Sequence, residues 1–167
     1  MSSESARASS AAETRFRIDD ANSRQRTVKV VALDTLSEAV VRRLAEAEWG
    51  GARFLAAAAL AAAPRTDRGI ATGEPGDVGG RGEPLSAGEG TDLVALVATA
   101  GEDLAPACVV GEACRMGATI IAFVLTGPST ARETLSRTLA QLRPWTLMLT
   151  IAEDEDCIGE VLRALRA

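Results

Sequence analysis

Short, almost wholly apolar runs that alternate with helical patterns constrain the fold of this chain more than any other feature. The runs at 28–33, 93–98 and 119–125 carry apolar side chains at nearly every position. Such runs are typical of strands that are buried on both faces of a parallel sheet. Because strands alternate with helices, right-handed crossovers are expected between them. The sequence therefore predicts one three-layer, Rossmann-like α/β domain around a mostly parallel sheet of four to five strands.

Helix signals follow the strand patterns. Thr35 and Glu38 match a capping box, Asp103 is a candidate N-cap, and Thr130 with Glu133 matches a second box. Helices are accordingly expected from Thr35, over 104–116, between the second box and Pro144, and over 157–165. A further strand is expected over 145–151. The first helix should bury one apolar face, made of Leu36, Val40, Leu44 and Ala47.

The chain divides into a tail and a single domain. Residues 1–26 are polar and charged, which predicts a disordered tail, and the folded domain should span 27–167. The segment 52–57 is expected to form a short strand, followed by a helical turn. The segment 64–90 is rich in glycine and proline and predicts a long mobile loop.

Composition excludes several kinds of chemistry and several kinds of partner. The chain has no histidine, which removes Ser-His-Asp and Cys-His nucleophile systems and His-ligated metals. The formal net charge of −5 disfavours nucleic acid and anionic membrane surfaces as partners. No secretion signal and no apolar stretch of about 18 residues is present, so a cytoplasmic protein is expected.

The cysteines and tryptophans are expected to be structural. Cys108, Cys114 and Cys157 form no CxxC or zinc spacing, and an odd count suits a reducing compartment. Cys108 and Cys114 lie in an apolar helical stretch, which predicts buried, inert thiols. Trp49 and Trp145 are expected to pack at the ends of elements.

The loops that follow the strands are the candidate binding sites, since ligands of parallel sheets collect beyond the carboxyl ends of the strands. The loops 34–38 and 99–103 contain one glycine between them and four carboxylates. Backbone N–H groups wrap a phosphate closely only where β-carbons are missing, so these loops disfavour one. If a nucleotide is bound at all, the candidate residues are Asp34, Thr35, Ser37, Thr99, Ala100, Gly101, Glu102, Asp103 and Gly127.

An acidic run, 153–156, comes after the last strand. Clustered carboxylates could hold a divalent cation, but acids are also favoured at helix N-termini. Because the run lacks the spacing and glycine of a calcium loop, the helix start is the favoured interpretation and no metal site is expected. The hydroxyls of Ser37, Thr99, Thr126 and Ser129 have no suitable base beside them, so caps are expected rather than nucleophiles, and no catalytic residue is assigned.

About two thirds of the chain resembles the nucleotide-binding half of the FtsZ/tubulin family. The stretches that carry the resemblance are VKVVALDTLSEAVVRRL (28–44), EWGGARFLAAAAL (48–60), DLVALVATAGEDLAPACVVGEACRMGATIIAFVL (92–125) and STARETLSRTLAQLRPWTLMLTIAEDEDCIGEVL (129–162). In the third stretch, Ala98, Ala100 and Gly101 begin the expected signature turn, and Ala105 with Pro106 opens the helix. The family's glycine run is missing from 34–38, and its signature loop is shortened to 99–103.

The resemblance implies a bacterial, cytoplasmic pseudo-GTPase. Its degenerate loops favour a catalytically silent FtsZ-like domain that acts through a protein partner or self-association, with no cofactor. One alternative is a divergent GTP-binding protein or GTPase of the family, which would bind GTP or GDP with magnesium. A further alternative is a small-molecule-binding α/β domain of sugar-isomerase or flavodoxin-like type, with its ligand between the 99–103 and 126–129 loops.

Overall fold

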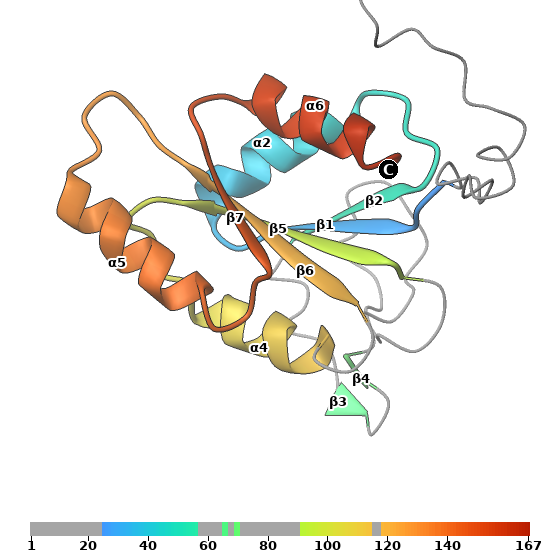
Figure 1. Cartoon of the computed structure of the whole chain (residues 1–167), viewed down its shortest axis with the longest axis horizontal. Coiled ribbons are helices and arrows are strands. Elements are labelled where there is room, and N and C mark those ends of the chain that lie inside the picture. Colours follow the sequence, from blue (N-terminus) through green and yellow to red (C-terminus); the bar gives the residue numbers. More distant parts are fainter. Residues whose placement is uncertain (1–24, 57–64, 67–68, 71–90, 115–117) are drawn as a thin grey trace, which may run out of the picture.

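A computed structural model describes residues 25–56, 65–66, 69–70, 91–114 and 118–167. Its centre is a five-stranded sheet in the order β2-β1-β5-β6-β7, in which every neighbouring pair is parallel (Figure 1). The predicted parallel sheet is therefore confirmed. The strands are β1 (Val28–Ala32), β2 (Ala52–Ala56), β5 (Leu93–Thr99), β6 (Thr119–Leu125) and β7 (Met148–Ala152).

Helices cover both faces of the sheet and complete the predicted three layers. One core cluster joins the sheet to α2 and α6, and a second joins it to α4 and α5 on the other face (Figure 1). Alternate residues of the strands supply the two clusters, as expected for a sheet that is buried on both faces. The helices are α2 (Thr35–Ala45), α4 (Ala105–Cys114), α5 (Arg132–Leu142) and α6 (Glu155–Ala164).

The strand order contains one reversal, and it lies between β1 and β5. From β1 the chain moves outward to β2, then returns across β1 to β5 and continues in the other direction through β6 to β7. This is the 2-1-3-4-5 order of flavodoxin-like doubly wound folds. Ligands in such folds bind at the carboxyl ends of the strands where the order reverses. In this chain, the loops after β1 and β5 lie at that point.

The N-terminal caps of two helices differ from the prediction. Asp34, not Thr35, is the N-cap of α2, and it forms a capping box with Ser37 rather than with Glu38. Asp and Ser are good capping residues, and the strand before Asp34 ends one residue earlier than expected. At α5 the N-cap is Ala131, which makes no side-chain cap, so the predicted box of Thr130 and Glu133 is wrong.

The buried face of α2 also differs from the prediction. Ser37, Val41 and Leu44 are buried, whereas Leu36 is 58% exposed. The predicted stripe is shifted by about one residue because α2 packs against both the sheet and α6. On α5 and α6, by contrast, the predicted apolar stripes pack against the core as expected, through Leu135, Leu139, Leu142, Ile158, Val161, Leu162 and Leu165.

The ends of the last two elements shift as well. The final strand starts at Met148 rather than at Trp145, because residues after α5 form a turn. The final helix starts at Glu155 rather than at Cys157. The strand predicted over 52–57 is observed as β2 and that over 119–125 as β6.

Part of the loop predicted over 64–90 forms a short two-stranded sheet. Within 64–90, β3 (Arg65–Thr66) pairs antiparallel with β4 (Gly69–Ile70), so this stretch is not without secondary structure. The rest of that loop, the helical turn expected after β2 and nearly all of the predicted tail lie outside the described residues. Within the described ranges, the chain has no helix that is long and apolar enough to span a membrane.

Candidate functional site

The side chain of Asp34 joins the two loops at the reversal of the strand order. Its Oδ2 accepts a hydrogen bond from the Thr99 amide at 2.7 Å, and its Oδ1 accepts from the Thr99 hydroxyl at 2.9 Å. Oδ1 also accepts from the Ser37 amide at 2.8 Å, which caps α2. Both loops therefore donate to one carboxylate. A negatively charged side chain takes the position, at a helix N-terminus, that a bound anion takes in nucleotide-binding proteins with doubly wound sheets.

Other backbone amides at this edge of the sheet also donate to side chains. The Gly101 amide donates to the Thr138 hydroxyl at 3.1 Å, and the Gly127 amide donates to the Thr130 hydroxyl at 2.9 Å. The Ala105 amide donates to Asp103 at 3.0 Å. Backbone N–H groups in loops at this edge of the sheet are the kind of donor that binds a phosphate. Side-chain oxygens satisfy them within the protein.

Gly101 is the one glycine of the two loops, and its conformation depends on having no side chain. Its φ is +98°, a region that L side chains rarely adopt. A β-carbon there would also lie 2.9 Å from the Thr134 methyl group. The close approach of this turn to α5 explains the glycine, so it needs no phosphate to account for it.

The structure brings only some of the predicted site residues together. Asp34, Ser37 and Thr99 form one hydrogen-bonded cluster. Ala100 packs against the core that lies under α4 and α5. The remaining predicted residues make no side-chain hydrogen bond to this cluster among the described contacts, and they are exposed or serve turns and helix starts: Thr35, Gly101, Glu102, Asp103 and Gly127.

Sequence reasoning missed Thr138 as a part of this region. It lies on α5, is only 3% exposed, and its hydroxyl accepts from Gly101 while donating to the Thr134 carbonyl at 3.2 Å. Its contact with Gly101 spans 37 residues of chain. No local pattern around a threonine in a helix indicates such a distant partner.

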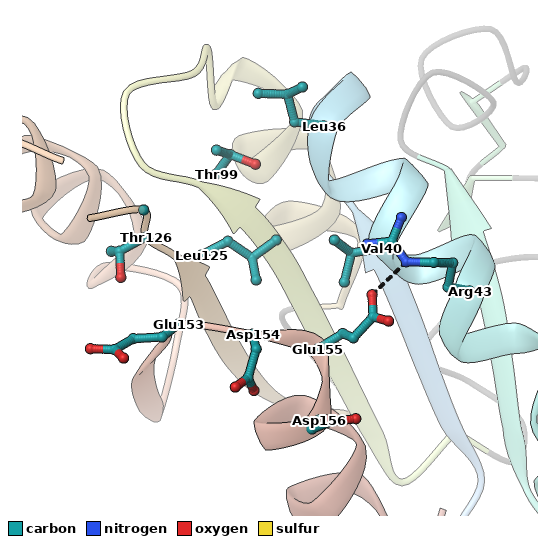
Figure 2. Close-up of a pocket in the computed structure, with 11 residues that line it drawn as sticks. Leu36, Val40, Arg43, Thr99, Leu125, Thr126, Glu153, Asp154, Glu155 and Asp156 are labelled. Atoms are coloured by element: carbon teal, nitrogen blue, oxygen red, sulfur yellow. Dashed lines mark hydrogen bonds and ion pairs between the residues drawn. The ribbon is translucent and has the colours of Figure 1, made fainter. Parts of the chain in front are cut away.

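A cleft opens beside the Asp34 cluster, at the carboxyl ends of β5, β6 and β7. It has a volume of about 540 Å³ and lies between α2 and the start of α6 (Figure 2). Its apolar wall is formed by Leu36, Val40 and Leu125, and Thr99 and Thr126 add hydroxyl groups. The exposure of Leu36, which the helix pattern did not predict, is explained by its place at this cleft.

The charges around the cleft are mostly negative. Glu153, Asp154, Glu155 and Asp156 line it, and Arg43 is the one basic side chain among its described lining residues. The Arg43 Nε donates to a Glu155 carboxylate oxygen at 2.6 Å (Figure 2). Because Glu155 already neutralises this guanidinium, the cleft repels phosphate groups and favours neutral or cationic ones.

The acidic run behaves as the start of a helix. Asp154 is the N-cap of α6 and accepts from the Cys157 amide at 2.9 Å, while Glu155 and Asp156 lie in the first turn. Acids at these positions are stabilised by the helix dipole. The favoured interpretation from the sequence is therefore confirmed. In the part of the chain that the structure describes, no group of three or more Cys, Asp and Glu side chains is arranged to hold a metal ion.

The cysteines fall into different environments. Cys114 is buried as predicted, Cys157 is half-buried and Cys108 is exposed, so the prediction for Cys108 is wrong. Cys108 faces outward because α4 buries the side with Ala107 and Val110. Burial raises the pKa of the Cys114 thiol from 9.0 to about 11, and the charge of Lys29 opposes this in part.

Both tryptophans pack at the ends of elements, as predicted. The Trp49 indole N–H donates to the Leu44 carbonyl at the end of α2, and its ring lies 5.7 Å from that of Phe54. The Trp145 ring lies so close to Gly111 of α4 that a β-carbon there would overlap it. Neither ring is placed to stack on a ligand in the cleft, since neither lines it.

Comparisons with known proteins add no relative. No protein-family model matches the chain, and no curated protein matches it. The fold and the site thus define a Rossmann-like α/β domain with a carboxylate at its reversal point. The function has to be argued from that geometry.

Proposed function

We propose that this chain is a catalytically silent, FtsZ-like domain that acts by binding a protein, either a different protein or a second copy of itself. The proposal keeps the α/β framework of the resembled family but not its nucleotide chemistry. The observation that supports it best is the Asp34 carboxylate, which accepts three hydrogen bonds from Ser37 and Thr99 at the reversal of the strand order.

A nucleotide would have to displace this carboxylate. It would then face the neighbouring acids Glu102 and Asp103 and would need amides that already have partners at Gly101 and Ala105. Two unit charges about 4 Å apart repel by about 4 kcal/mol at an effective dielectric constant near 20. The cost of entry is therefore large for a di- or triphosphate.

Calorimetric titration of the full chain with GTP and GDP, with and without magnesium, tests whether the loops around Asp34 bind a nucleotide. We expect no binding heat up to millimolar nucleotide and no GTP hydrolysis above the buffer rate. The alternative, a divergent GTPase, predicts magnesium-dependent turnover that Asp103→Ala reduces. Micromolar binding of either nucleotide would overturn the proposal.

A second candidate function, the binding of a small molecule, is favoured by the cleft between α2 and α6. Its volume of about 540 Å³ suits a small organic ligand, and its position at the strand ends is where such folds bind ligands. Its acidic lining favours an amine over a phosphate ester.

A thermal-shift screen tests whether the cleft between α2 and α6 binds a small molecule. The panel should contain sugar phosphates, FMN and primary amines, and a true ligand should raise the melting temperature. Val40 lines the cleft, whereas the neighbouring Ala39 is exposed and does not. The shift should be lost in Val40→Arg and kept in Ala39→Arg. A panel without any shift would count against a small-molecule function.

A further inference from the structure

We draw no further inference here: the strongest candidate, the apolar outer edge of β7 with its exposed Met148 and Ile151, carries none, because nothing in the described part of the structure shows what covers it.

Discussion

Replacement of Asp34 tests how much the carboxylate at the reversal point stabilises the fold. Asp34→Ala removes the cap of α2, worth about 1 kcal/mol. It also removes the two hydrogen bonds from Thr99, at 2.7 and 2.9 Å. Hydrogen bonds to charged groups contribute about 1.5–3 kcal/mol each to stability. Because Asp34 is half-buried, water can bond to the Thr99 groups in the variant, which lowers the loss for each bond. About 1 kcal/mol for each Thr99 bond gives a total loss of about 3 kcal/mol.

Urea unfolding, followed by circular dichroism, measures this loss. Asp34→Asn keeps an oxygen for the Ser37 amide but offers an NH₂ group, which cannot accept from the Thr99 amide. It should lose about 1–2 kcal/mol. Asp103→Ala, at an exposed helix start with one bond to Ala105, is the matched control and should lose no more than about 1 kcal/mol.

A double-mutant cycle isolates the link between the loops. Thr99→Val removes the hydroxyl bond to Asp34 in the wild-type background. In the Asp34→Ala background the same change should cost almost nothing, which gives a coupling of about 1 kcal/mol. A free energy of unfolding of Asp34→Ala within about 0.5 kcal/mol of the wild-type value, or additive effects of the two substitutions, would show that Asp34 does not stabilise the fold through Thr99.

Three further predictions concern packing and the thiols. Gly111→Ala places a β-carbon against the Trp145 ring and should destabilise the protein by about 1–3 kcal/mol in urea unfolding, whereas Gly127→Ala meets nothing closer than 3.9 Å and should cost far less. Because the pKa of Cys114 is raised from 9.0 to about 11 in the fold, the unfolded chain ionises first as the pH rises. Stability should be retained below pH 9 and decrease by about 2–3 kcal/mol as the pH rises to about 11. At pH 8, a thiol reagent should modify exposed Cys108 rapidly and buried Cys114 only as the protein unfolds, as mass spectrometry of digested samples would show.

Each of these has a clear contrary result. Equal costs for the two glycine variants would mean that Trp145 moves aside freely. Cys114→Ala should flatten the decrease in stability between pH 9 and 11, and a profile as steep as that of the wild type would assign the decrease to another group. Rapid labelling of Cys114 in the folded protein would contradict its burial.

The strands could be predicted because their signal is local. Most side chains in the run 119–125 are β-branched or aromatic, and the run forms β6 with the same bounds. Helix faces and caps were less predictable. Leu36 continues an apolar stripe in sequence, yet it lines the cleft because α2 packs against both the sheet and α6 with another part of its surface.

The sequence pointed to the two loops at the ends of β1 and β5, but not to the hydrogen bonds that join them. The carboxylates and the scarcity of glycine at 34–38 and 99–103 indicated that a phosphate would be disfavoured. The bond from Thr99 to Asp34, however, joins residues 65 positions apart, and only the placement of β5 beside β1 brings them together. No local pattern carries that information.

Amide chemical shifts during a titration with GDP and magnesium show whether the loops at the reversal point are open to a nucleotide. Asp34 already accepts the hydrogen bonds of the Ser37 and Thr99 amides there. In ¹⁵N-labelled protein, these two amide signals should stay in place up to millimolar GDP. Saturable shifts of both signals at micromolar GDP would mean that a nucleotide displaces the Asp34 carboxylate.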